Sequence, residues 1–311
     1  MTSNKAASVK QRLLNLSRTR KENFSFLLER YMLERFLYRL GRSPYRESFL
    51  LKGAMLFSLW GNLPHRMTRD MDLLGIGSPQ LDAVKQKVTD ICAEAYDDDG
   101  LIFDASSIVV VPIREQNLYD GVRVSLFCFL GKAKMRLQID VGFGDSIYPQ
   151  PTHSIYPAIL DDLDAPQIEA YRMETTIAEK FHAMTDLGIR NSRLKDYFDI
   201  AWLVEHFEFE FDQVRGAIVH TFERRGSSLP KQLPLGLTET FATDAQKNTQ
   251  WRAFLKKTHA HQPKTLTETV DTIVCFLEPV IALLSQESEN KMNWTSTEGW
   301  VKIERQQGEA E

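Results

Sequence analysis

The sequence predicts an α+β fold in which a mixed, partly antiparallel sheet flanked by helices is followed by a mainly helical C-terminal lobe. Two observations lead to this fold class. In the first half of the chain, segments with helical spacing flank three β-rich runs that are joined by short turns, and such turns make strands antiparallel neighbours. Beyond about residue 175 the strand signals fade and helical spacing dominates.

The N-terminal helices are predicted from apolar residues that recur every three or four positions. Residues 6–40 show this spacing and predict one or two amphipathic helices, broken near the Gly-Arg-Ser-Pro stretch at 41–44. Residues 47–59 and 81–96 predict two more helices. The acidic run 97–100 after the last of these is expected to be a solvated turn and no metal site.

The predicted strands surround an Asp-x-Asp motif and continue beyond it. They are residues 68–74, 108–113, 122–130 and 134–143. The Pro- and Asp-rich stretch 149–166 is expected to cross from one lobe to the other, and helices are expected from Glu174 and from Arg190 onward. We therefore divide the chain into residues 1–150 (N-terminal helices and core), 151–290 (helical lobe) and 291–311 (polar tail).

Charge is distributed unevenly along the 311 residues, although the net charge is only −4. Residues 1–46 hold eleven Lys and Arg against three Glu, and residues 220–264 hold eight against three acids. Basic surfaces beside an acidic centre suit an enzyme that acts on a polyanion, but helix surfaces can also simply differ in charge. No apolar run is long enough to span a membrane, so we expect a cytoplasmic protein whose three separated cysteines are buried thiols.

The chemistry concentrates between residues 52 and 72. Side chains at i and i+2 of a strand share a face, so Asp70 and Asp72 would present two carboxylates together, and hard oxygen ligands suit Mg²⁺. Upstream, Lys52-Gly53-Ala54 opens an apolar segment, and small residues there allow phosphate oxygens to approach backbone N–H groups. The two elements together predict a site that binds phosphate and metal.

A third carboxylate, Asp140, lies between Ile139 and Val141 on the last predicted strand. Burying it is unfavourable unless it is paired or bound to metal, although it could also accept backbone N–H bonds at the strand end. There is neither a Walker loop nor a nucleophile elbow, which disfavours P-loop phosphoryl transfer and serine hydrolysis.

These motifs resemble those of the nucleotidyltransferase superfamily of the DNA polymerase beta type. Within it, the local sequence Leu-Lys-Gly-Ala-Met followed by Thr-Arg-Asp-Met-Asp-Leu resembles the AbiEii/AbiGii toxin family. Ala54 departs from the Ser or Gly that the superfamily often has. The resemblance implies two Mg²⁺ ions held by Asp70, Asp72 and Asp140, with an NTP as substrate. It implies that the nucleotide is bound by Lys52, Gly53, Ala54, Arg69 and Lys180.

Two further motifs resemble the second lobe of the same toxin family, a Glu-Lys pair at Lys180 and an Arg-x-Lys-Asp-x-x-Asp motif that contains Asp196. By resemblance Lys180 contacts the triphosphate and Asp196 supports the catalytic network. Alternatively these charges lie on a helix surface, where Arg193 could pair with Asp196 and Lys195 with Asp199. The roles of Asp145, Lys195 and Asp199 stay open.

The resemblance implies a toxin that adds nucleotides to an RNA acceptor, the 3′ end of tRNA being one target, and that is neutralised by a cognate antitoxin. Two other functions stay open: nucleotidyl transfer to a protein or small-molecule hydroxyl, and a catalytically silent nucleotide-binding module. We also hypothesise that Arg224, Arg225, Arg252, Lys256 and Lys257 form an RNA-facing surface, because RNA must be guided past the carboxylates.

Overall fold

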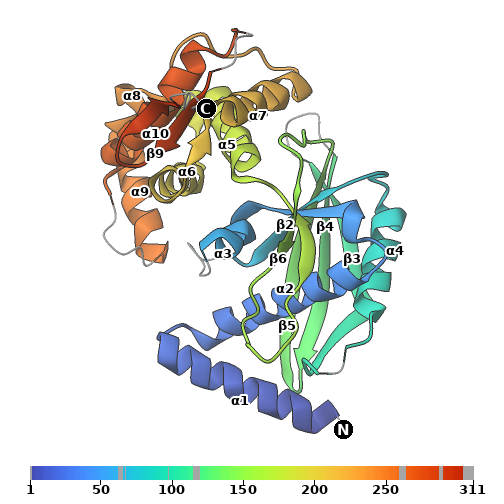
Figure 1. Cartoon of the computed structure of the whole chain (residues 1–311). Helices are drawn as coiled ribbons and strands as arrows, with labels where there is room; N and C mark the ends of the chain where they lie inside the picture. Colours follow the sequence, from blue (N-terminus) through green and yellow to red (C-terminus); the bar gives the residue numbers. More distant parts are fainter. Residues whose placement is uncertain are drawn as a thin grey trace, which may run out of the picture. The chain divides into compact units, whose positions relative to one another are not determined.

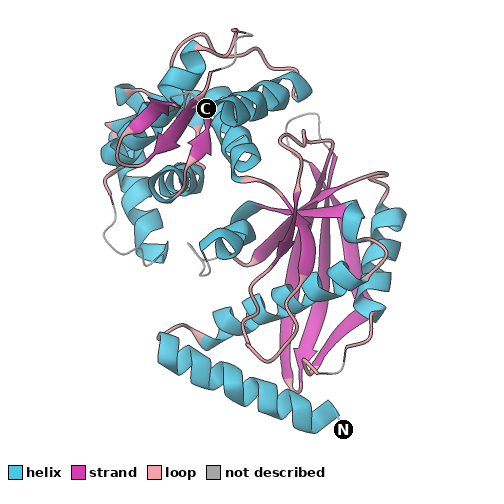
Figure 2. Ribbon diagram, viewed as in Figure 1, coloured by secondary structure: helices cyan, strands magenta, loops and turns pink. Residues whose placement is uncertain are grey.

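The computed structural model describes residues 2–61, 66, 68–96, 98–114, 120–258, 264–286 and 290–303. In this part of the chain the α-helices are α1 (Thr2–Arg20), α2 (Phe24–Arg42), α3 (Leu56–Gly61), α4 (Leu81–Ala93), α5 (Met173–Leu187), α6 (Leu194–His206), α7 (Phe211–Arg224), α8 (Glu239–Ala242), α9 (Ala245–Thr258) and α10 (Leu266–Ala282). The strands are β1 (Phe49–Lys52), β2 (Asp70–Gly75), β3 (Leu101–Arg114), β4 (Asp120–Leu130), β5 (Ala133–Phe143), β6 (Thr152–Ile155), β7 (Gln167–Ala170), β8 (Phe209–Glu210), β9 (Met292–Thr295) and β10 (Gly299–Lys302). Figures 1 and 2 show these elements.

The chain divides into two compact units. The first contains Met1–Asp145 and Pro151–Tyr171, and the second contains Ser146–Gln150 and Arg172–Glu311. The segments 1–150, 151–290 and 291–311 stay a prediction as domains, and residues 151–171 group with the first unit because β6 and β7 extend its sheet.

The described strands of the first unit form a mixed sheet in the order β3-β4-β5-β2-β1-β7-β6. β2 runs parallel to β5, and β1 runs parallel to β7, whereas the other neighbouring pairs are antiparallel. This confirms the predicted mixed, partly antiparallel sheet. The parallel pairing of β2 with β5 brings the Asp-x-Asp motif beside Asp140 although about seventy positions separate them in the sequence.

One face of this sheet is covered by helices α2 and α4, which Figure 1 shows against the long strands. Phe103 of β3 points to this side, where its ring centroid lies 6.0 Å from that of Phe36 in α2. Every second residue of β4 and β5 points to the same side, and two of these residues, Val124 and Ile139, are fully buried beneath the helices. Because successive strand residues point to opposite faces, the intervening residues point away from these helices.

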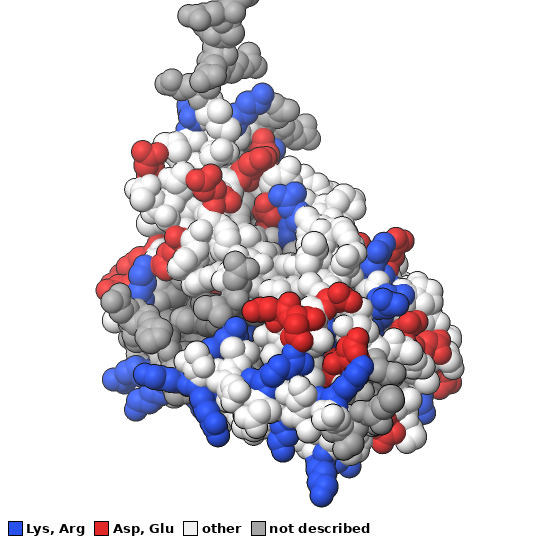
Figure 3. All heavy atoms as spheres, turned by 60° about the horizontal axis from the view of Figure 1, so that its bottom comes forward, with Lys and Arg blue, Asp and Glu red and all other residues white. Residues whose placement is uncertain are grey.

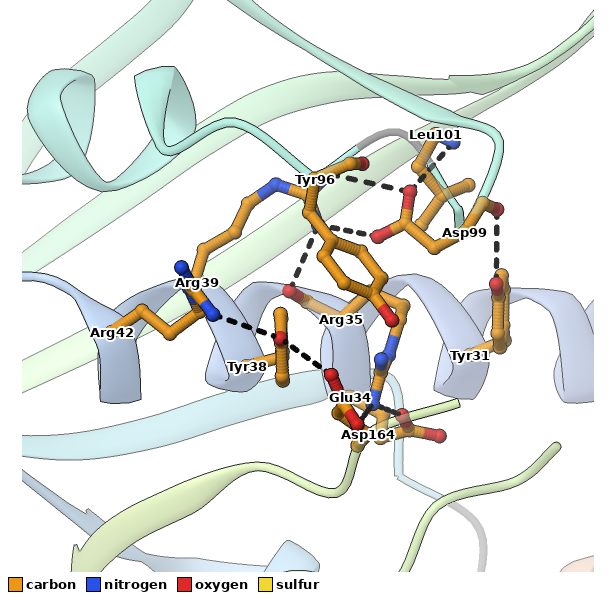
Figure 4. A network of polar contacts seen from close by, with 10 residues as sticks. All are labelled: Tyr31, Glu34, Arg35, Tyr38, Arg39, Arg42, Tyr96, Asp99, Leu101 and Asp164. Atoms are coloured by element: carbon orange, nitrogen blue, oxygen red, sulfur yellow. Dashed lines mark hydrogen bonds and ion pairs between the residues drawn. The ribbon is translucent and has the colours of Figure 1, made fainter. Parts of the chain in front are cut away.

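Helix α2 is tied to the rest of the first unit by a buried polar network, drawn in Figure 4. Arg39 donates to both carboxylate oxygens of Asp99, at 2.6 and 3.3 Å, and Asp99 also accepts from the backbone N–H of Leu101 at 2.9 Å. Tyr31 donates to the Asp99 carbonyl at 2.9 Å. Asp99 is fully buried, so the expectation of a solvated acidic turn was wrong at this residue. A buried carboxylate requires such partners.

The predicted helix 47–59 was wrong in its first half. Phe49–Lys52 is strand β1, Gly53–Met55 is one turn of 3-10 helix, and only Leu56–Gly61 is α-helical. β1 lies inside the sheet between β2 and β7, so Phe49, Leu50 and Leu51 are buried on both faces. A strand buried on both faces has a continuous apolar run, which periodicity cannot distinguish from a short helix.

The second unit is mainly helical, as predicted, but it also contains a small sheet in the order β10-β9-β8. β9 and β10 form an antiparallel hairpin within the segment that we expected to be a polar tail. Trp294 donates to the Val204 carbonyl and Trp300 to the Phe276 carbonyl, each at 2.8 Å. These two tryptophans anchor the hairpin to the helices because each ring is packed and its N–H is satisfied.

The surface of the described residues combines both charge signs. Figure 3 shows acidic side chains beside basic ones on the face that it brings forward. On α1, which contains no acidic residue, Lys5 pairs with Asp98 and Arg12 with Asp162. No helix in the described ranges is long and apolar enough to cross a membrane. Cys128 is buried as expected, whereas Cys275 is exposed, which corrects the prediction for that thiol.

Candidate active site

A row of side chains crosses five strands of the first unit on the face that points away from α2 and α4. Lys52 of β1 lies opposite Asp72 of β2, and Asp72 lies beside Asp140 of β5. The row continues through Arg123 of β4 to Val111 of β3. Residues directly opposed across neighbouring strands share a face of the sheet. The row therefore places two carboxylates between two cations.

The Asp-x-Asp motif occupies the first half of β2. Asp70 and Asp72 are half-buried on the exposed side of the strand, whereas Met71 and Leu73 are buried on the other side. Asp70 lies one row away from Asp72 and is opposed by Gln138 of β5. The three aspartates singled out from the sequence thus come from two neighbouring parallel strands.

Gly53 is required where the chain turns out of β1 into the 3-10 turn. Its φ is +72°, a conformation that residues with a Cβ rarely adopt. A Cβ at this position would lie 2.1 Å from Oδ2 of Asp72 and 2.8 Å from the Asp72 Cβ. The backbone at Gly53 therefore lies directly against the carboxylate of Asp72.

Lys52, the predicted phosphate contact, has a defined partner. Its Nζ donates to Oδ2 of Asp145 at 2.6 Å and lies 5.7 Å from the centre of the Tyr171 ring. The Lys52 and Asp145 side chains are 17% and 9% exposed, so the pair is largely withdrawn from solvent. Asp145, whose role the sequence left open, orients the ammonium group beside the aspartate row.

Asp140 is held by Arg123 through two parallel hydrogen bonds. Nε donates to Oδ1 and NH2 donates to Oδ2, each at 2.8 Å. The side-chain hydrogen bond to Asp140 raises the pKa of Arg123 above its ordinary value, burial opposes this, and the charges of Asp140, Asp70 and Asp72 add to the increase. Arg123 therefore interacts with the charges of all three aspartates, and bidentate pairing fixes the plane of the Asp140 carboxylate.

The donor chemistry of the site fits Mg²⁺ in part. Asp70 and Asp72 offer the hard carboxylate oxygens that this ion prefers. Within the described ranges, however, no three His, Cys, Asp or Glu side chains are arranged to hold a metal ion. Both oxygens of Asp140 accept hydrogen bonds from Arg123. Each carboxylate oxygen has a second lone pair, so Asp140 can keep its bonds to Arg123 and still offer an oxygen to a metal ion.

The two other predicted nucleotide contacts of this unit lie at its margins. Arg69 has an 80% exposed side chain, with Nε 3.7 Å from Oε2 of Glu29. Burial raises the pKa of Glu29, Arg69 opposes this increase and Asp70 adds to it. Ala54 is buried and lines a cavity together with Arg20 and Arg30 of the N-terminal helices.

In the second unit, Lys180 of α5 is clamped between two aspartates of α6. Its Nζ donates to Asp196 and Asp199, at 2.8 Å each, and both carboxylates are fully buried. Arg193 donates to the second oxygen of Asp196 at 2.7 Å, which is the i,i+3 pair considered from the sequence. Burial acts to raise the pKa of Asp196, but Lys180 and Arg193 outweigh it and hold the pKa below its ordinary value. Lys195, by contrast, is exposed.

A buried histidine of the second unit forms a further polar cluster. His182 contacts Ser227 Oγ through Nε2 at 2.8 Å, and Arg225 contacts Nδ1 at 3.2 Å. Arginine only donates, so Nδ1 is the acceptor, and in the neutral ring Nε2–H then donates a hydrogen bond to Ser227 Oγ. Ser227 is therefore not activated as a nucleophile. Arg225, assigned from the sequence to an RNA-facing surface, is directed at His182 and lies 4.0 Å from Glu179.

Sequence reasoning missed the roles of Arg123 and Asp145. The signal for Arg123 was its position in an alternating strand, where Val122 and Val124 are buried and Arg123 therefore points to the opposite face. Its pairing with Asp140 depends on the register of β4 with β5, which the sequence does not specify.

The structure brings together the glycine turn and the same-face Asp-x-Asp strand, the two motifs by which the sequence resembles nucleotidyltransferases. A family profile described as "Nucleotidyl transferase AbiEii toxin, Type IV TA system" matches residues 35–274. The chain belongs to this AbiEii nucleotidyltransferase toxin family, which confirms the resemblance seen in the sequence.

Two solved structures from Helicobacter pylori are remotely similar to the chain. One is the crystal structure of JHP933, with 14% identity, a TM-score of 0.47 and coverage of 85% of this chain and 93% of that one. The other is described as a candidate nucleotidyltransferase, with 14% identity, a TM-score of 0.46 and coverage of 85% and 98%. No curated protein sequence matches the chain.

Proposed function

We propose that the protein transfers a nucleoside monophosphate from an NTP to a hydroxyl group of RNA, with the 3′ end of tRNA as the target. The proposal includes a requirement for Mg²⁺, a cytoplasmic location and neutralisation by a cognate antitoxin. The observation that carries it is the row Lys52–Asp72–Asp140 with the Gly53 backbone against the Asp72 carboxylate. Membership of a nucleotidyltransferase toxin family supports the reaction class.

The proposed roles in the first unit follow from position and charge. Asp70 and Asp72 would hold Mg²⁺, which when bound neutralises phosphate charge and stabilises the leaving pyrophosphate. Because Gly53 has no Cβ, the backbone of the turn lies directly against the Asp72 carboxylate, so a phosphate that is held by a metal ion on Asp72 would lie beside the N–H groups of this turn. Lys52, oriented by Asp145, supplies a positive charge for the triphosphate. Asp140 is the carboxylate beside which the attacking hydroxyl would lie.

Lys180 and Asp196 are retained as proposed catalytic residues on the strength of their motif. The Lys180 ammonium is buried between two carboxylates and only 10% of its side chain is exposed. Such a clamp holds the ammonium in one position, which suits a point-charge contact to a phosphate. Its contact with the nucleotide is a proposal that rests on the family motif.

The test incubates the protein and Mg²⁺ with each of the four α-labelled NTPs and total RNA. Label should enter RNA, and Asp72→Asn should reduce incorporation on the order of 10²–10³-fold, since metal ligation contributes several kcal/mol to the transition state. Asp82→Asn is the matched control, because Asp82 is exposed on α4 and away from the site.

The destination of the label separates this proposal from the alternatives. Label in protein or in a small molecule would replace RNA as the acceptor. An equal loss of activity in the Asp72 and Asp82 variants, or a loss that only follows unfolding, would contradict the assignment of Asp72.

A further inference from the structure

Beyond the aspartate row, the same face of β3, β4 and β5 continues as an aromatic and basic surface. We call this surface the platform and define it by Ile102, Phe127, Phe129, Lys134 and Arg136. Phe127 lies opposite Arg136, and Phe129 lies between Ile102 and Lys134 in the register of the three strands. On β4 and β5 the platform residues have the same parity as Arg123 and Asp140, and Ile102 of β3 lies opposite Phe129, so all five share the face of the aspartate row.

Several apolar side chains on and beside the platform remain open to solvent. Ile102 is 61% exposed, and Val109 and Val111 of the same strand are 54% and 43% exposed. The neighbouring residues of opposite parity, such as Phe103, are buried beneath α2 and α4. Exposed apolar side chains that cluster on one face of a sheet indicate a binding surface.

The charges of the platform favour an anionic occupant. Lys134 and Arg136 are exposed, and the Lys134 Nζ lies 3.6 Å from the centre of the Phe127 ring and 5.6 Å from that of Phe129. One acidic residue, Asp104, lies opposite Phe127 in the same row as Arg136, and its Oδ1 accepts from the backbone N–H and the hydroxyl of Ser106. A cation beside two aromatic rings is the combination that binds single-stranded nucleic acid, through phosphate contacts and base stacking.

Part of the platform lies on the same strand as Asp140 and close enough for a bound RNA strand to reach the aspartates. Arg136 precedes Asp140 by four residues on β5, which corresponds to about 13 Å along an extended strand. A chain bound on the platform could therefore extend along the strands toward the aspartates.

We propose that the platform binds the single-stranded end of the RNA acceptor, with bases stacked on Phe127 and Phe129 and phosphates paired with Lys134 and Arg136. This inference deepens the proposed function and rests on RNA being the acceptor. On binding, Lys134 exchanges its contact with the ring for a phosphate, and the exposed cation–π contact that is lost is weak.

The test measures binding of a labelled 12-nucleotide single-stranded RNA to the full chain by fluorescence anisotropy, in EDTA and without NTP. In Lys134→Gln/Arg136→Gln the slope of log K against log salt should become shallower by about 1.4, since each lost phosphate contact in a single strand contributes about 0.7. Phe127→Leu/Phe129→Leu should weaken binding about 5-fold or more, because stacking on each ring is lost. Lys85→Gln/Lys302→Gln removes the same charge from exposed positions elsewhere and should leave the slope unchanged.

Unchanged RNA binding in both platform variants would overturn the inference. A further variant, Arg20→Gln/Arg30→Gln, alters the cavity beside Ala54. A loss of RNA binding in this variant alone would also overturn the inference. Thermal unfolding of each variant shows whether it is folded. Incorporation of labelled NTP by the unaltered protein tests the proposed function separately: label in RNA with unchanged platform variants refutes only the platform, whereas label in protein alone refutes the RNA acceptor.

Discussion

Replacing Gly53 by alanine adds one methyl group at the point where the backbone passes against Asp72. Two terms contribute to the expected destabilisation. A non-glycine residue at φ +72° costs about 1–3 kcal/mol, and forcing an atom into an occupied position costs about 1–3 kcal/mol more. The second term applies because the new Cβ would lie 2.1 Å from Asp72 Oδ2, so the carboxylate must move.

Gly226→Ala is the matched control, since Gly226 has a φ of +61° and a Cβ there would meet nothing within 4 Å. The control carries the backbone term alone. The free energy of unfolding of Gly53→Ala should therefore be about 1–3 kcal/mol lower than that of Gly226→Ala. Its midpoint in urea should be lower as well. It should also lose about 10²-fold in nucleotide incorporation, because a displacement of about 1 Å at a catalytic group has this effect.

A double variant identifies the source of the clash. Asp72→Gly removes every atom that the added Cβ would meet most closely, so the cost of Gly53→Ala in that background should fall to that of Gly226→Ala. If Gly53→Ala and Gly226→Ala are equally stable, or if Gly53→Ala retains full activity, the close approach of Gly53 to Asp72 has no functional meaning and the reasoning is refuted.

Three further predictions concern the ion pairs. Arg123→Gln should lower the free energy of unfolding by less than about 1 kcal/mol, because both Arg123 and Asp140 are partly exposed. It should nevertheless reduce nucleotide incorporation, because Asp140 is no longer held in place. An unchanged initial rate of incorporation would contradict a positioning role for Arg123. Lys180→Ala should destabilise by about 3–5 kcal/mol in urea unfolding, because it removes the ammonium group that lies between two buried carboxylates, while Lys195→Ala at an exposed position should stay within about 0.5 kcal/mol. The pKa of Asp196 in the folded state is depressed, so this residue stabilises the fold above its unfolded pKa of about 3.9. That stabilisation is lost as the pH falls through the folded-state pKa. Asp196→Asn should therefore flatten the acidic part of a plot of unfolding free energy against pH, measured by urea unfolding at each pH.

The sequence predicted those elements whose periodicity is local. Helices α1, α2 and α4 and the strand that carries Asp70 and Asp72 lie where the spacing of apolar residues placed them. A half-buried element alternates or repeats in a way that one segment shows by itself. The prediction of β1 failed because a strand buried on both faces has no such pattern.

Long-range partners could not be predicted from local pattern. Asp99 looked like one acid of a solvated turn, and only the packing of α2 brings Arg39 to it across sixty positions. Arg123 looked like the polar side of an ordinary strand until the register placed it on Asp140. The hairpin β9–β10 lies in a polar stretch, and its tryptophans pack on helices far away in sequence. Each of these features depends on tertiary contacts that override local preference.

The position of β1 in the middle of the sheet has a consequence for synthesis on the ribosome. Leu50 and Leu51 pair on one side with β2 and on the other with β7, which ends at residue 170. Until that residue has emerged, β1 has an unpaired edge and the strand that carries Lys52 is incompletely fixed. At about 5–20 residues per second, the first 170 residues take on the order of ten to thirty seconds to make. A nascent or prematurely terminated chain therefore contains all the aspartates of the row for some time without the strand that completes their support.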